Sequence, residues 1–133
     1  MLRTSNTATQ TLPAGSQIAL GAATIQTGGT RANAVLSGSN SISLRRPCYY
    51  KVSAVIAASA AAVNVVIDMM VNGVKYSTSK SYSAAVGQDA QVVFDEIVPV
   101  NQNDCCCTPT LITFVTEFDA TVDNITVNVD RLC

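Results

Sequence analysis

The sequence predicts an all-β fold in which two antiparallel sheets pack into a sandwich. Short apolar stretches alternate with turn residues at near-regular intervals, which is typical of sandwiches. The chain has no long helical segment, and its 133 residues suit one domain with a single core. The last stretch shows the clearest period of two, because Ile125, Val127 and Val129 alternate with polar residues.

The first 16 residues are polar and contain Pro13 and Gly15. We therefore predict an extended N-terminal arm over residues 1–16 and a single sandwich domain over residues 17–133. The alanine-rich segment 57–62 is too short for a stable helix, so we predict a connection there. Candidate strands in this first half of the chain are residues 17–20, 23–26, 32–36, 41–45 and 49–58.

The Asn72-Gly73 pair predicts a tight hairpin, because both residues favour the positive φ angles of a type I′ turn. Such a turn would make one face of the hairpin apolar. The expected opposite pairs are Val71 with Val74, Met69 with Tyr76, and Ile67 with Thr78.

Three more strands are predicted in the second half of the chain. The first covers residues 91–98 and ends before Pro99. The second covers residues 111–118, with Ile112, Phe114 and Phe118 on one face. The third is the alternating stretch over residues 122–131.

Composition excludes several functions. Eight Lys and Arg against nine Asp and Glu leave no basic surface for nucleic acid. Charged residues are 13% of the chain, where about 25% is usual, and apolar residues are 48%. We expect so apolar a domain to cover surface against other copies of itself. The 12 serines and 14 threonines allow its exposed faces to be hydrated without adding charge.

No apolar segment follows Arg3, so we expect no signal peptide and synthesis in the host cytoplasm. Residues 52–71 form the one long apolar run. Asn64 and Asp68 interrupt it, and an Asp is costly at the centre of a membrane helix. We therefore predict strands there and no membrane span.

Three segments resemble a known family: residues 42–44 (Ile-Ser-Leu), residues 47–52 (Pro-Cys-Tyr-Tyr-Lys-Val) and the strand that ends in Val-Asn-Gly at 71–73. They look like the jelly roll of tumour-necrosis-factor-like and complement-type globular heads. Cys48 stands where that family has Gly, and Val52 stands where it has an aromatic residue. Residues 11–15 (Thr-Leu-Pro-Ala-Gly) and the cysteine-rich loop also resemble small proteins of phages and prophages of Gram-positive gut bacteria.

The resemblance covers roughly residues 10–133 and implies a homotrimer with a structural or attachment role. We expect a subunit of a phage particle, either a capsid decoration or a head fibre on the virion surface. Its arm, residues 1–12, would contact other virion proteins, and a host-surface glycan would be a further partner. The alternative is a cell- or spore-surface head domain that binds a glycan or protein receptor. A small-ligand jelly roll such as a lectin is a third class, and it would benefit from Trp, which is absent.

The sequence points away from an enzyme and from a cofactor. No His is present to activate a Ser or Cys nucleophile. A Ser-Lys pair would need Lys51, Lys75 or Lys80. Asp95 and Glu96 are adjacent on a strand and point to opposite faces, so they cannot share a site. Asp119 and Asp123 suit turn solvation better than catalysis or calcium binding, and Gly28-Gly29-Thr30 lacks the Lys of a phosphate loop.

Five cysteines are present: Cys48, Cys105, Cys106, Cys107 and Cys133. We expect free thiols that pack as small apolar groups. Disulfides are the second alternative, and a metal site is the third. Only Cys105 and Cys107 approach the spacing of zinc ligands.

Overall fold

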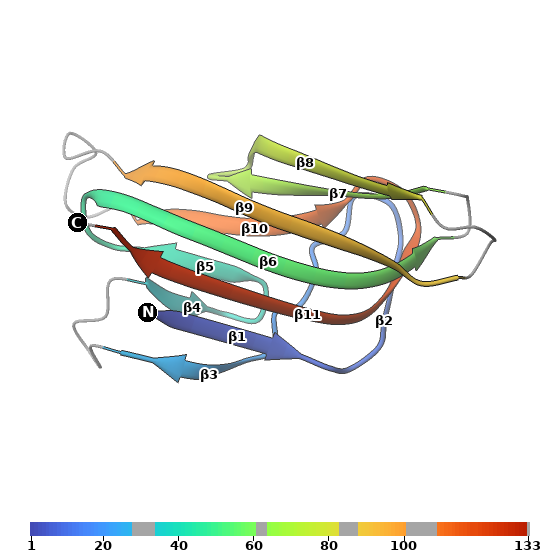
Figure 1. Ribbon diagram of the computed structural model, residues 1–133, viewed down its shortest axis with the longest axis horizontal. Coiled ribbons are helices and arrows are strands. Elements are labelled where there is room, and N and C mark those ends of the chain that lie inside the picture. Colours follow the sequence, from blue (N-terminus) through green and yellow to red (C-terminus); the bar gives the residue numbers. More distant parts are fainter. Residues whose placement is uncertain (28–33, 61–63, 83–87, 101–108, 133) are drawn as a thin grey trace.

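A computed structural model, which describes residues 1–27, 34–60, 64–82, 88–100 and 109–132, shows two antiparallel sheets packed face to face (Figure 1). Sheet A has the order β3-β1-β11-β6-β9, with β2 also beside β11, and sheet B has the order β4-β5-β10-β7-β8. The predicted all-β sandwich is confirmed. The strands are β1 (Leu2–Asn6), β2 (Gln10–Leu12), β3 (Ala22–Gln26), β4 (Ala34–Ser37), β5 (Ser41–Leu44), β6 (Cys48–Ala60), β7 (Asn64–Val71), β8 (Val74–Tyr82), β9 (Ala90–Val100), β10 (Thr110–Thr116) and β11 (Ala120–Arg131).

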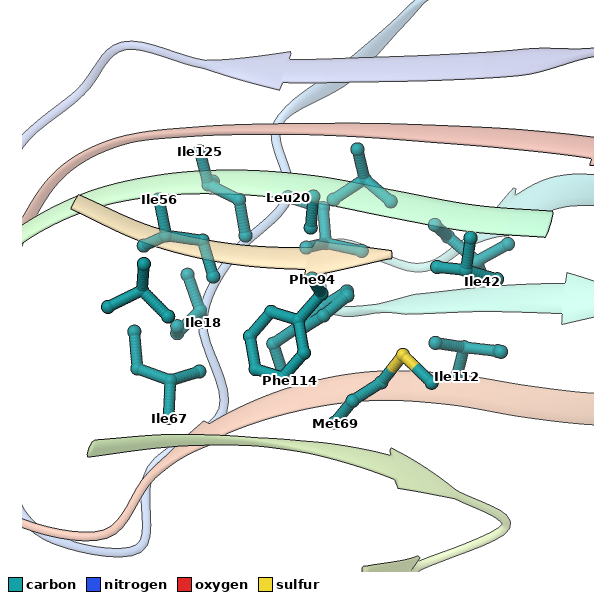
Figure 2. Packing of buried hydrophobic residues seen from close by; sticks show 14 of the residues in the cluster. Ile18, Leu20, Ile42, Ile56, Ile67, Met69, Phe94, Ile112, Phe114 and Ile125 are labelled. Atoms are coloured by element: carbon teal, nitrogen blue, oxygen red, sulfur yellow. The ribbon is translucent and has the colours of Figure 1, made fainter. Parts of the chain in front are cut away.

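The core lies between the sheets and follows from the alternation in the sequence. On β11, the predicted apolar face of Ile125, Val127 and Val129 is buried. At the centre, the rings of Phe94 on β9 and Phe114 on β10 meet with centroids 5.4 Å apart (Figure 2). Aromatic packing across the two sheets joins them through the favourable tilted geometry.

The predicted separation of an N-terminal arm from the domain is wrong. β1 lies between β3 and β11 in sheet A, where Leu2 faces Val129 and is fully buried. β2 adds to the same sheet, with Leu12 opposite Ala120. The sequence did not predict these strands, because residues 2–12 are mostly polar and show no clear alternation of apolar and polar side chains. The first 12 residues therefore belong to the sandwich and do not form a free arm that could anchor it elsewhere.

Residues 17–20 do not form the strand predicted for them; they run irregularly beside β10, with a single bridge from Gln17 to Val115. Ile18 and Leu20 are nevertheless fully buried and pack in the core (Figure 2). The side-chain amide of Gln10 replaces a strand partner, because its Oε1 accepts from Ala19 N at 2.8 Å and its Nε2 donates to Ala19 O at 2.9 Å. The predicted strands over residues 23–26 and 41–45 are confirmed as β3 and β5. The strand predicted over residues 32–36 corresponds to β4 in its described part.

The described part of the alanine-rich segment, residues 57–60, is not a connection, because β6 continues through Ala60. Pairing with β11 overrides the helix propensity of alanine, and Ala58 and Ala60 point into the core. The long apolar run thus falls on β6 and β7. Within the described residues, no helix is long and apolar enough to cross a membrane.

The hairpin turn is confirmed, with φ angles of 52° at Asn72 and 78° at Gly73, and Val71 faces Val74 as predicted. The other two predicted pairs are wrong. The register shifts so that Tyr76 is an extra residue on β8, and Met69 faces Ser77 while Ile67 faces Ser79. A bulge of this kind cannot be read from alternation, because the inserted residue is itself apolar. The inner face of β8 is consequently lined by serines.

Two strand ends differ from prediction. β9 continues through Pro99 to Val100, which the sheet tolerates because β9 is an edge strand and Pro lacks only the outward donor. β10 ends at Thr116, so Phe118 lies beyond it and is exposed instead of sharing a face with Ile112 and Phe114.

Candidate functional site

The outer face of sheet A carries a strip of exposed apolar side chains, which we call the apolar strip. It is built by β6 and β9, whose outward positions alternate with core positions. Val55 faces Val93 directly across the two strands, and Lys51 faces Ile97. The members of the strip are Tyr49, Val55, Val93 and Ile97, with exposed fractions between 39% and 59%. Apolar residues grouped on a sheet face make this strip a candidate interaction surface.

A small polar network divides the strip. Lys51 Nζ lies 3.7 Å from Asp95 Oδ1, and Ser53 Oγ donates to the same oxygen at 3.2 Å. On the other face of β9, Glu96 accepts a hydrogen bond from Ser77 Oγ at 2.8 Å. The prediction that Asp95 and Glu96 point to opposite faces is therefore confirmed. The outer polar pair can fix the register of a partner, while its exposed ions contribute little stability themselves.

The edge of sheet A at β9 is joined to the edge of sheet B at β8 by side-chain hydroxyls. Ser79 Oγ donates to the carbonyl of Val93 at 3.3 Å, and the Tyr76 hydroxyl donates to the carbonyl of Ile97. These bonds occupy carbonyl groups that an edge strand would otherwise offer to another chain. The bulge at Tyr76 places this side chain over β9.

A charged cluster lies on the outer face of sheet B. The carboxylate of Asp68 is buried and accepts from Thr78 Oγ1 at 2.6 Å, while Lys75 Nζ lies 3.6 Å from its other oxygen. Lys75 Nζ also donates to Glu117 Oε1 at 2.9 Å. The hydrogen bond to Glu117 and the nearby charge of Asp68 raise the pKa of Lys75 above its usual value. A lysine held in its charged form cannot serve as the base of a Ser-Lys pair.

The other candidate catalytic groups are dispersed. Lys51 lies in the polar network that divides the apolar strip, and Asp119 accepts a hydrogen bond from Ala14 N at 2.8 Å near the start of β11. Asp123 lies beside Asp89, and the hydrogen bond between the two carboxyl groups raises the pKa of Asp123. The side chain of Lys80 and residues 28–30 lie outside the described structure. In the part of the chain that is described, no three metal-ligating side chains come together.

Cys48, at the start of β6, is disulfide-bonded, so the expectation of a free packed thiol is wrong for this residue. It faces Val100, the last residue of β9. Cys105, Cys106, Cys107 and Cys133 lie outside the described residues, and the zinc spacing of Cys105 and Cys107 stays a prediction. Spacing could not predict the bond, because pairing of distant cysteines depends on the fold.

The apolar strip was missed at the sequence level, although a signal was present. In Val92-Val93-Phe94 the residues on both faces of the strand are apolar, and Tyr49 and Val55 add outward apolar positions on β6. A strand with one wet face should alternate, so an apolar run on an antiparallel strand indicates that both faces are covered.

Comparisons with known proteins show the fold. No protein-family model and no curated protein matches the sequence. Among solved structures, the TNF protein Eiger from S. frugiperda superposes with a TM-score of 0.78 at 6% identity, over 99% of this chain and 91% of that chain. A CBM35 module of Abf62 from Cellvibrio japonicus gives a TM-score of 0.46 at 10% identity, over 98% and 96% of the two chains. The Podospora anserina GH26-CBM35 β-(1,4)-mannanase gives 0.44 at 15% identity, over 99% of this chain and 28% of that chain. The chain therefore has a TNF-like jelly-roll fold, as its sequence resemblance implied.

Proposed function

We propose that this protein is a non-enzymatic structural subunit of a phage particle. It forms a homotrimer that decorates the capsid or serves as a head fibre, and it assists attachment to the host. The apolar strip carries this proposal, because it groups exposed apolar side chains of the described residues on one face of a sheet. The phage assignment itself rests on the resemblance of residues 11–15 and of the cysteine-rich loop.

The chemistry of the apolar strip supports self-association. Val55 and Val93 form one contiguous patch because they are opposite each other on adjacent strands. Ile97 lies further along the same face of β9, beyond the polar pair of Ser53 and Asp95. Stable interfaces between identical subunits are more apolar than the remaining surface, and leaving such side chains in water is unfavourable. A ring of three copies covers the strip on every subunit with one kind of contact.

The disulfide at Cys48 supports a location outside the reducing cytoplasm. Disulfides persist in oxidising surroundings, which include virion and cell surfaces. A virion protein made in the host cytoplasm would form this bond after release. The same bond suits the alternative, a cell- or spore-surface head domain that binds a glycan or a protein receptor.

Molar mass in solution tests the trimer. The wild-type protein should have the mass of three chains by light scattering, and Val93→Lys should dissociate it because the introduced charge cannot be buried without a partner. Leu111→Lys, on the outer face of sheet B, is the matched control and should leave the mass unchanged. A wild-type mass of one chain would refute the trimer.

Purified particles test the phage assignment. Virions produced by the bacterium that encodes the chain should contain it in mass spectra, and antibodies should label the particle surface. Absence from the virions, together with labelling of intact cells or spores, would favour the alternative. A glycan array on the folded protein then separates a glycan receptor from a protein receptor.

A further inference from the structure

The most exposed strand of the described structure is β3, at the end of sheet A. All five of its residues, Ala22–Gln26, are exposed, and β3 is the one strand among the described residues with this property. It pairs with β1 on one side, and its other side is the edge of the sheet. An exposed edge presents backbone groups that a further strand can pair with.

β3 is nevertheless held in an ordered conformation. The Met1 ammonium group donates to Thr27 Oγ1 at 2.7 Å, and Thr27 N donates to Met1 O at 3.0 Å. Thr24, the extra residue of a bulge against β1, donates through Oγ1 to Arg3 O at 3.3 Å. Thr24 thus directs its hydroxyl toward β1, and Thr27 joins the end of the strand to Met1. A strand ordered before binding loses less entropy when it pairs with a partner.

The two edge strands of sheet A, β9 and β3, differ in how far their outer backbone groups are occupied. At β9, hydroxyls from β8 occupy the carbonyls of Val93 and Ile97. At β3, the segment from Ala22 to Thr27 contains no charged residue and no proline. Charged residues, prolines and bulges are the usual features that block pairing at an edge strand. Of these, β3 has only the bulge at Thr24.

We propose that β3 is a second interaction surface that pairs antiparallel with β3 of another copy of the chain. The strand sequence is compatible with itself in this arrangement. Ala22 of one copy would face Gln26 of the other, Ala23 would face Ile25, and Thr24 would meet Thr24. No like charges meet in this register. The contact is two-fold, so it joins two trimers, or two monomers, without using the apolar strip.

Paired charge variants test this proposal. Ile25→Lys and Ile25→Glu each place a charge on the exposed edge, where the two introduced side chains of a pair lie on a diagonal within reach of each other. Sedimentation velocity of the wild type should show its basic unit doubling as concentration rises. Each variant alone should need about tenfold more protein to double. An equimolar mixture of the two variants should double as readily as the wild type.

The controls separate this contact from folding and from the trimer. Gln91→Lys, an exposed position on β9, adds the same charge away from β3 and should leave doubling unchanged. Circular dichroism should show that every variant keeps its sheet content. If the wild type never doubles, or the mixture remains as dissociated as each variant alone, the proposal is wrong. Failure of the trimer changes only the basic unit, from three chains to one, and leaves this test intact.

Discussion

The hydroxyl of Tyr76 on β8 donates to the carbonyl of Ile97 on β9 and so links the free edges of two different sheets. Ser79 adds a second link of the same kind to Val93. The sandwich is thereby tied along one side, where the hairpin β7–β8 and the edge strand β9 run next to each other (Figure 1). This side of the molecule is stabilised by side chains that lie outside the apolar core.

Removing the Tyr76 hydroxyl should weaken this tie. We expect Tyr76→Phe to lower the free energy of unfolding by about 1 kcal/mol, the usual net value of one such hydrogen bond. Urea unfolding followed by circular dichroism measures it. Tyr49→Phe removes the hydroxyl of another exposed tyrosine and is the control. Equal losses in the two variants would contradict a specific role for the bond to Ile97.

Two buried threonines should respond in opposite directions to the same substitution. Thr4 Oγ1 is buried without a hydrogen-bond partner, while Thr116 Oγ1 donates to Pro13 O at 3.4 Å. Thr4→Val should stabilise the fold by about 1 kcal/mol, because it removes an unpaired polar group from the core. Thr116→Val should destabilise it by a similar amount. Melting temperatures of both variants decide the matter, and the same sign for both would contradict this account.

Gly21 should not tolerate a side chain. Its φ of +78° disfavours any L-residue, and an added Cβ would contact Ser5 O and lie 2.8 Å from Asn6 Cβ. Gly15 has a similar φ of +82° but open space around it. Gly15→Ala should therefore cost about 1–2 kcal/mol from the backbone alone, and Gly21→Ala should cost clearly more. Chemical denaturation of the pair measures the difference, and equal losses would mean that β1 moves aside without cost.

The disulfide at Cys48 should stabilise the fold by about 2–4 kcal/mol, mainly by restricting the unfolded chain. A reducing agent should lower the melting temperature of the wild-type protein, and Cys48→Ala should lower it to a similar extent without a reductant. Peptide mapping without reduction identifies the bonded partner. A melting temperature that does not respond to reductant would show that the bond is absent in solution.

The carboxyl pair of Asp89 and Asp123 should make stability depend on pH. Asp123 has a raised pKa because its side chain hydrogen-bonds to Asp89, with burial and the charge of Asp89 adding to the rise. The folded state therefore holds this proton more tightly than the unfolded state does. Its stabilising contribution is present below the ordinary Asp pKa of 3.8 and is lost as pH rises through the higher folded value.

Replacing one carboxyl of this pair tests the linkage. Asp89→Asn should remove that part of the pH dependence and raise stability at neutral pH relative to the wild type. Asp130→Asn, which changes net charge equally at a position of β11 away from this pair, is the control. Melting curves from acid to neutral pH provide the measurement, and parallel curves for all three proteins would contradict the predicted pairing.

Much of the fold was determined by local pattern in the sequence. The alternation on β6 and β11 fixed which side chains enter the core, and Asn72-Gly73 fixed the hairpin turn, because period two and positive φ are local properties. The TNF-like order was also indicated by short motifs around residues 42–52. What these patterns share is that neighbouring residues alone decide them.

The tertiary structure decided what depends on residues far apart in the chain. Leu2 lies on a strand because β1 pairs with β11, where Leu2 faces Val129. β6 extends through its alanines because it also pairs with β11. The bulge at Tyr76, the bond of Cys48 and the grouping of Val55 with Val93 likewise arise where separate strands meet. Pairing partners at long range set these features, and no local periodicity records them.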